Sequence, residues 1–147
     1  PYEQPYITHF PVQDSDPALG LGLVCSMEHK FNLKDLAAYV RDRLGVSQLR
    51  LWLGNHAEST VLERIAICGG SGASLIPVAQ KKADIFISGD FSYHSLLDSS
   101  LPLIDAGHFH TERPVLDYLK KEITAFGLEA LVLPDTQHEY LQRSLWI

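Results

Sequence analysis

The 147-residue chain has few cysteines, no excess of basic side chains and no long apolar run, and each shortage argues against a class of protein. Its two cysteines, Cys25 and Cys68, lie inside apolar stretches, which is typical of buried thiols in a reducing compartment rather than of a disulfide framework. Twelve basic against eighteen acidic residues give a net charge of −6, which disfavours non-specific binding to nucleic acid. We expect neither a membrane span nor a signal peptide, and predict a cytoplasmic globular protein.

Apolar patterns along the chain predict an α/β fold with a mixed, mostly parallel sheet and helices on both faces. Asn32 is a good N-cap for a helix that Gly45 ends. Strands are predicted over residues 21–27, 46–53, 64–68, 84–88, 101–106 and 129–133, and further helices over 73–82, 93–98 and 111–126. The predicted core includes Leu36, Val40, Ile65, Ile67, Ile85, Ile87, Leu103, Ile104 and Leu119. Residues 1–18 hold four prolines and little periodicity, which predicts an extended lead-in.

Polar turns follow three successive predicted strands, at residues 69–72, 89–94 and 107–112. If these strands are parallel neighbours, the turns meet at the edge of the sheet where α/β proteins bind ligands. His108 and Glu112, four residues apart, can converge on one divalent cation. Oligomerisation could complete the site by bringing in extra ligands, with His94 or His110 as candidates. The alternative is that the histidines of this turn are ordinary polar surface.

The other two turns also contain candidate functional residues. The backbone N–H groups of Gly70, Ser71 and Gly72 could cradle an anion, although a plain tight turn explains the same residues. Asp90 and His94 are candidate catalytic residues, able to orient a metal-bound water or to relay a proton. Asp90 could equally cap the short helix that follows it.

Three ordered segments, residues 65–76, 83–94 and 103–113, resemble motifs of the Ngg-one-interacting-factor-three-like family. Many of its members are named GTP cyclohydrolase I type 2 homologues. The resemblance runs from about residue 20 to residue 134. Residues 1–5 also resemble the segment that closes an inserted PII-like domain in longer members. We therefore expect the carboxyl portion of a larger protein, with a lead-in from a preceding domain over 1–18 and an α/β metal-site domain over 19–147.

The resemblance implies one half of a duplicated α/β fold that holds a pair of divalent metal ions, which could be zinc, manganese, iron or magnesium. The family's ligand motif, a histidine followed four residues later by a glutamate, falls on His108 and Glu112, and His94 lies near that site. The other ligands come from an amino-terminal half whose motifs do not occur here. That half and further copies of the chain are the implied partners, because the family forms ring-like oligomers, commonly hexamers.

Three functions are compatible with these expectations. The first is a metal-dependent hydrolase in the full-length protein, acting on a small phosphorylated or nucleotide-like ligand. The second is a non-enzymatic metal-handling module, and the third is an interaction scaffold with a structural metal. Because two ligands fall short of a complete site, we expect the isolated chain to bind metal weakly and to show no hydrolysis.

Overall fold

A computed structural model of the chain describes residues 8–11 and 20–133. Its elements are β1 (Thr8–Pro11), β2 (Gly20–Asn32), α1 (Leu33–Leu44), β3 (Arg50–Trp52), β4 (Val61–Ser71), the 3-10 helix η1 (Ala73–Leu75), α2 (Ile76–Ala79), β5 (Ile85–Gly89), α3 (Tyr93–Leu97), β6 (Leu103–Asp105), α4 (His108–Glu112) and α5 (Pro114–Ala125). Most of the predicted lead-in lies outside the described residues. Its described part forms the edge strand β1, which tolerates Pro11 at its end.

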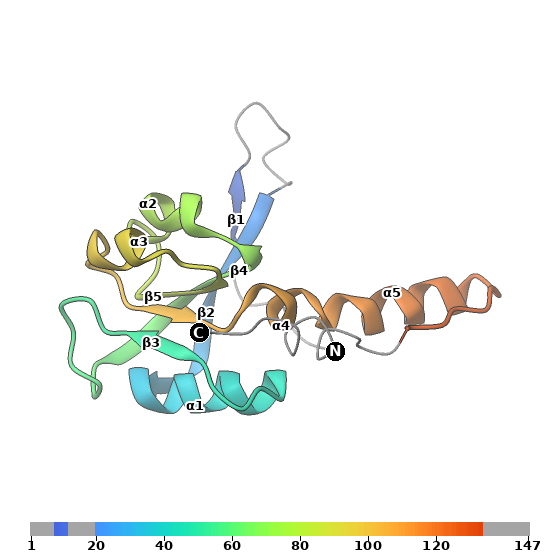
Figure 1. Ribbon diagram of the computed structural model, residues 1–147, viewed down its shortest axis with the longest axis horizontal. Helices are drawn as coiled ribbons and strands as arrows, with labels where there is room; N and C mark the ends of the chain where they lie inside the picture. The colour runs from blue at the N-terminus through green and yellow to red at the C-terminus, as the bar shows by residue number, and fades with distance from the viewer. Residues whose placement is uncertain (1–7, 12–19, 134–147) are drawn as a thin grey trace, which may run out of the picture. The chain divides into compact units, whose positions relative to one another are not determined.

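The strands form one mixed sheet in the order β1-β2-β4-β5-β6-β3 (Figure 1). The central strands β4, β5 and β6 run parallel, with Ile65 opposite Ile85 and Ile87 opposite Ile104. The outer pairings, β1 with β2, β2 with β4 and β3 with β6, are antiparallel. This arrangement confirms the predicted α/β class. It also brings the carboxyl ends of three successive strands to the same edge of the sheet.

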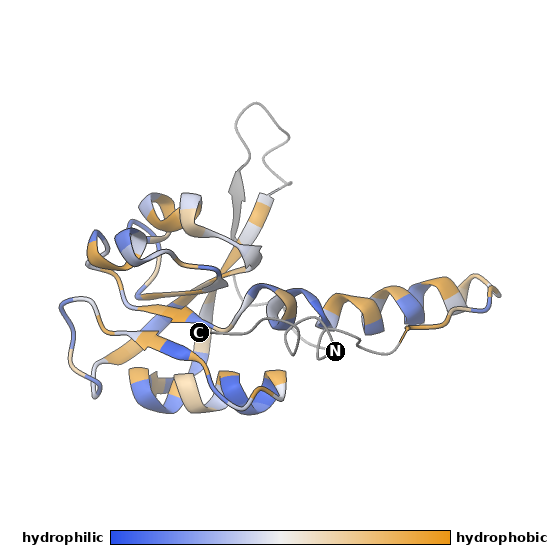
Figure 2. Ribbon diagram, in the orientation of Figure 1, coloured by the Kyte–Doolittle hydropathy of each residue, from blue (hydrophilic) through white to orange (hydrophobic). Residues whose placement is uncertain are grey.

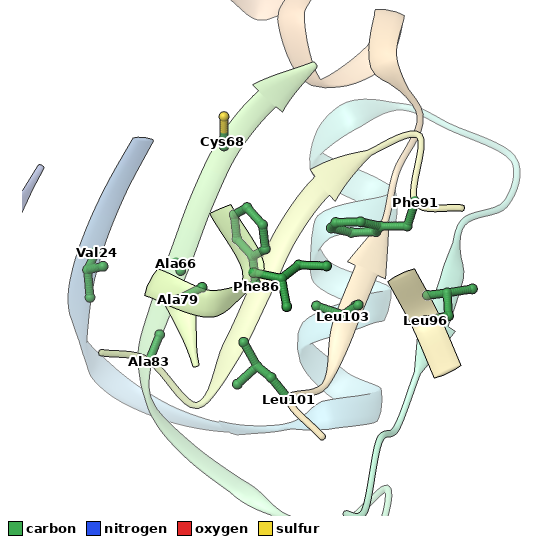
Figure 3. Packing of buried hydrophobic residues seen from close by; sticks show 11 residues of the cluster. Val24, Ala66, Cys68, Ala79, Ala83, Phe86, Phe91, Leu96, Leu101 and Leu103 are labelled. Atoms are coloured by element: carbon green, nitrogen blue, oxygen red, sulfur yellow. The ribbon is translucent and has the colours of Figure 1, made fainter. Parts of the chain in front are cut away.

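Helices cover both faces of the sheet, as predicted, with α1 on one face and α2 and α3 on the other (Figure 1). Each face has its own apolar core. The α1 side contains Leu33, Leu36, Ala37, Leu62, Ile65, Ile85, Ile87, Ile104 and Ala106. The other side contains Val24, Ala66, Cys68, Ile76, Ala79, Ala83, Phe86, Phe91, Leu96, Leu101 and Leu103 (Figure 3). Apolar residues recur along α1 at helical spacing between polar ones, so that one side of the helix can be buried (Figure 2).

The prediction of a buried position is wrong for two residues of the predicted core, Ile67 and Leu119. A third residue, Val40, is only half-buried. Ile67 is 40% exposed, because alternation along β4 points Ala66 and Cys68 into one core while Ile67 faces the other side, where the α1-side core ends at Ile65. Leu119 on α5 is 45% exposed. Val40 lies at the margin of the α1-side core.

Several predicted element boundaries also change. The predicted helix over 111–126 is interrupted at Arg113, because the proline at position 114 lacks the N–H group that would continue the helical hydrogen bonds, although Arg113 itself keeps helical dihedral angles. The predicted helix over 73–82 is a short 3-10 turn followed by α2, and the predicted strand over 46–53 shrinks to β3. Residues 129–133, predicted as a strand, are irregular.

The chain divides into two compact units, residues 1–112 and residues 113–147. The first contains the sheet, and the second contains α5, along which apolar and polar positions also alternate (Figure 2). Within the described part of the chain, no helix combines the length and apolar character needed to cross a membrane.

The caps of α1 agree with the sequence prediction. The Asn32 side-chain oxygen accepts the Asp35 backbone N–H at 2.8 Å, and Gly45 ends the helix in the left-handed conformation at φ 66°. We expect Asn32→Ala to lower the free energy of unfolding by about 1 kcal/mol, because an N–H of the first turn loses its acceptor. Urea denaturation measures the change, with Asn55→Ala in an exposed turn as the control. Equal stability of the two variants would contradict the role of the cap.

Candidate metal-binding site

The candidate site lies at the edge of the sheet where β4, β5 and β6 end. Gly70 lies near the end of β4, Asp90 follows β5, and α4 begins three residues after β6 with His108. One turn of α4 places Glu112 beside His108. The structure therefore brings together residues from all three predicted turns.

The His108 imidazole lies between two carboxylates. Its Nδ1 atom is 2.8 Å from Oδ2 of Asp90, and its Nε2 atom is 3.2 Å from Oε2 of Glu112. All three side chains are about half exposed, so the group is open to solvent and to a ligand. Asp90 is thus placed to orient the ring, whereas Nε2 and the Glu112 carboxylate form the pair that could face a cation.

Gly70 supplies the space beside this pair. A Cβ atom at this position would lie 2.5 Å from Oε1 of Glu112 and 3.1 Å from Nε2 of His108. Gly70 also has a left-handed conformation at φ 69°, which L side chains rarely adopt. Its N–H donates to Oγ1 of Thr111 at 2.9 Å, and its carbonyl accepts from the Ser88 hydroxyl at 3.0 Å. The backbone of β4 is therefore fixed against the His108–Glu112 pair.

These contacts show that the glycine-rich segment packs closely against its neighbours. Ser71 still belongs to β4, and the N–H of Gly70 is already bonded to Thr111. Gly72 makes room for Ser88 and Phe86, whose atoms would lie within 3 Å of an added Cβ. The structure shows that neighbouring side chains pack closely against Gly70 and Gly72. Anion binding by Gly70, Ser71 and Gly72 stays a prediction.

The two neighbouring carboxylates favour the protonated form of His108. Its hydrogen bond to Asp90 is the largest influence and raises the pKa of the imidazole above the usual histidine value; desolvation lowers the pKa, and the charges of Glu112 and Asp90 raise it. A neutral imidazole has only one N–H and cannot donate to both carboxylates, whereas an imidazolium can. A divalent cation between Nε2 and Glu112 could replace one of these protons, while Asp90 keeps the proton on Nδ1.

The remaining histidines named from the sequence have other described ring contacts. His94 is exposed on α3, and its ring lies 5.8 Å from that of Tyr93. His110 is exposed on α4, with its ring 5.3 Å from that of Phe109. Among the described contacts, neither ring pairs with His108 or Glu112. Asp90 does not cap the short helix that follows it, because the N-cap of α3 is Ser92.

Cys68 lies on β4 near the site but behaves as a structural thiol. Burial raises the pKa of its thiol, and the Glu112 charge adds to that effect. The Sγ atom is 3.1 Å from the carbonyl oxygen of Leu21, to which the thiol donates. Because metal ligation requires the thiolate, these surroundings disfavour Cys68 as a ligand.

Four residues that support the site were not singled out from the sequence: Arg50, Ser88, Asp105 and Thr111. Asp105 accepts three backbone N–H groups and pairs with Arg50, while Thr111 and Ser88 hold Gly70. A charged or hydroxyl residue at the end of an apolar strand is the signal that could have identified Asp105 and Ser88. Arg50 carries no such signal, because its role depends on the pairing of β3 with β6.

The donor set fits part of a divalent-metal site. An imidazole nitrogen and a carboxylate face the same space beside Gly70, and both donor types suit zinc or a similar ion. Within the ranges 8–11 and 20–133, no three His, Cys, Asp or Glu side chains are arranged to hold one ion. The described residues therefore supply two donors and not a complete coordination shell.

The fold and the strand-end site define an α/β protein with a histidine–carboxylate pair, and comparison with known proteins identifies its family. The chain belongs to the Duf34/NIF3 (NGG1p interacting factor 3) family, which it matches over residues 4–138. It is 30% identical over 136 residues to a "GTP cyclohydrolase 1 type 2 homolog" from Nostoc sp., covering 90% of this chain and 51% of that protein.

Solved structures agree with this assignment. The protein ybgI, described as of unknown function, has a TM-score of 0.67 at 27% identity, covering 80% of this chain and 49% of that one. The hypothetical protein SA1388 of Staphylococcus aureus has a TM-score of 0.65 at 31% identity, covering 72% of this chain and 30% of that one. The chain thus spans between about a third and a half of the length of the curated relatives it matches.

Proposed function

We propose that this chain supplies one side of a divalent-metal site, with Nε2 of His108 and the Glu112 carboxylate as ligands. The observation that carries the proposal is the 3.2 Å approach of these two groups beside Gly70, where an added Cβ would fill the space next to both donors. Asp90 holds the opposite ring nitrogen, which is the usual second interaction of a metal-bound histidine. The missing ligands would come from outside the described residues, in agreement with the greater length of the relatives.

In the complete protein we propose metal-dependent hydrolysis of a small phosphorylated or nucleotide-like substrate. A bound divalent ion lowers the pKa of a coordinated water and stabilises negative charge on a substrate. His108 and Glu112 are half exposed, which leaves the donor pair accessible to water and substrate. The name shared by the relatives, GTP cyclohydrolase 1 type 2 homolog, favours a purine nucleotide as the first probe.

Titration calorimetry with Zn²⁺ tests the metal site directly. With two donors per chain, we expect an affinity no tighter than about micromolar. His108→Ala should abolish the binding, whereas His56→Ala, which changes an exposed histidine in the turn after β3, should leave it unchanged. Tight binding that survives His108→Ala would refute the assignment.

Turnover by the full-length protein separates the hydrolase from the two other functions. Loss of GTP that depends on added metal, stops with chelator and fails in His108→Ala would support the hydrolase. Metal transfer to an apo client without turnover would support the metal-handling module instead. Retention of the metal with neither turnover nor transfer would favour the scaffold.

The raised pKa of His108 predicts how metal binding depends on pH. Because a cation displaces the Nε2 proton, zinc affinity should rise by about tenfold per pH unit below the pKa of His108 and level off above it. Below that pKa, calorimetry in buffers of different ionisation enthalpy should also detect about one proton released per ion. An affinity that stays constant between about pH 6 and 7, within the usual titration range of histidine, would contradict this competition.

A further inference from the structure

Asp105, at the end of β6, connects the two turns that carry Asp90 and His108. Its side chain is only 13% exposed. Oδ1 accepts the backbone N–H groups of Asp90 at 3.2 Å and Gly107 at 3.1 Å, and Oδ2 accepts that of Phe91 at 3.2 Å. One carboxylate therefore joins the turn after β5 to the turn after β6.

Arg50 holds the same carboxylate from the neighbouring edge strand. It lies opposite Asp105 in the pairing of β3 with β6, and its Nη2 atom is 2.7 Å from Oδ2 of Asp105. The same nitrogen is 2.7 Å from the carbonyl oxygen of Phe91. Arg50 thus offsets the carboxylate charge and bonds to the turn that Asp105 also holds.

The conformation of Asp90 shows what these bonds maintain. Among the described residues, Asp90 is the only non-glycine with a positive φ, at 58°. This conformation is unfavourable for L-amino acids, although aspartate tolerates it better than most. The N–H groups of Asp90 and of Phe91 both donate to Asp105, so the turn is held in this conformation. The Asp90 carboxylate then reaches Nδ1 of His108 at 2.8 Å.

We propose that Asp105, supported by Arg50, is a positioning residue for the metal-binding pair. It holds the left-handed turn at Asp90, and Asp90 in turn holds the His108 ring with Nε2 directed toward Glu112. The inference rests on the proposed metal-binding function, because the orientation matters for the ion that Nε2 would bind. Carboxylates in such outer positions fix the tautomer and the ring orientation of histidine ligands.

Asp105→Asn keeps the shape of the side chain and removes its charge. We expect its zinc affinity, measured by calorimetry, to fall by about 10- to 100-fold relative to the wild type. Asp84→Asn is the matched control, because the Asp84 carboxylate accepts the N–H groups of Glu63 and Arg64, both at 2.8 Å, at the opposite end of the parallel strands. It should lose comparable backbone hydrogen bonds and keep the wild-type affinity.

The state of the metal-free ring gives a second measurement that does not require zinc. Long-range ¹H–¹⁵N spectra, recorded where His108 is neutral, should show the Nδ1–H tautomer in the wild type and a shift to Nε2–H in Asp105→Asn. If the wild type binds no zinc, the proposed function fails, and this tautomer comparison still decides whether Asp105 positions the ring.

Arg50→Gln keeps the inference testable if Asp105→Asn does not fold. It leaves the carboxylate and its three backbone bonds in place, so we expect a zinc affinity lower by about tenfold, with the tautomer shifted in the same direction. Wild-type tautomer and wild-type affinity in every folded variant of these two positions would overturn the inference. The same changes in Asp84→Asn would also overturn it, because they would reflect a general loss of structure.

Discussion

Replacing Gly70 by alanine is expected to lower the zinc affinity of the chain by about 100-fold. This is the upper end of the loss seen when a residue that supports metal ligands is changed. The added methyl group would lie 2.5 Å from Oε1 of Glu112 and 3.1 Å from Nε2 of His108, so at least one donor must move. Gly70 itself cannot easily retreat, because Thr111 holds its N–H and Ser88 holds its carbonyl. The substitution therefore disturbs both proposed ligands without removing either.

Gly45→Ala separates this steric effect from backbone strain. Gly45 has nearly the same left-handed conformation, at φ 66° against 69° for Gly70, but an added Cβ there meets nothing within 4 Å. We expect Gly45→Ala to lower the free energy of unfolding by about 1 kcal/mol and to leave zinc affinity unchanged. Calorimetry and urea denaturation of both variants provide the comparison. A Gly70→Ala protein that binds zinc as tightly as the wild type would show that the ion does not occupy this space.

The close approach of His108 and Glu112 could be predicted from sequence because it depends on local geometry. A turn after a strand places both residues at the edge of the sheet. The helical spacing that pairs them was not predicted, because the predicted helix starts at residue 111 whereas α4 begins at His108. The parallel order of β4, β5 and β6 followed in the same way from the alternation of strands and helices. Both inferences use short stretches of chain.

The support around that pair depends on contacts between residues distant in the sequence. Arg50 and Asp105 are 55 positions apart and meet only because β3 returns to pair with β6. Gly70 and Thr111 are 41 positions apart, and their bond requires the full path through β5 and β6. Spacing within one segment carries no information about such pairs, which explains why Asp105 and Thr111 were missed.

Burial on the sheet was predictable only in part, for a related reason. A continuous apolar run indicates that a strand is buried but does not say how far the cover extends on each face. Ala66 and Ile67 are neighbours in the same run, yet Ala66 is fully buried and Ile67 is 40% exposed. The two residues point to opposite faces, and the two apolar cores end at different positions along β4.

Phe86→Ala is expected to lower the free energy of unfolding by about 3–5 kcal/mol, because it removes a large ring from a closely packed core. Phe86 on β5 is completely buried, and its ring lies edge-on to that of Phe91, with centroids 5.7 Å apart (Figure 3). Phe91 belongs to the turn that Asp105 and Arg50 hold. Loss of the Phe86 ring should therefore leave a cavity and also loosen the turn that carries Asp90.

Ile67→Ala is the matched control for this prediction. It lies one strand away, where Ile67 pairs with Ile87, the residue following Phe86 on β5. Because Ile67 is 40% exposed, its truncation should cost less than about 1 kcal/mol. Urea denaturation of the two variants gives both values. Similar losses would mean that Ile67 is covered in the folded protein, whereas a small loss for Phe86→Ala alone would contradict the tight packing of the core around β5.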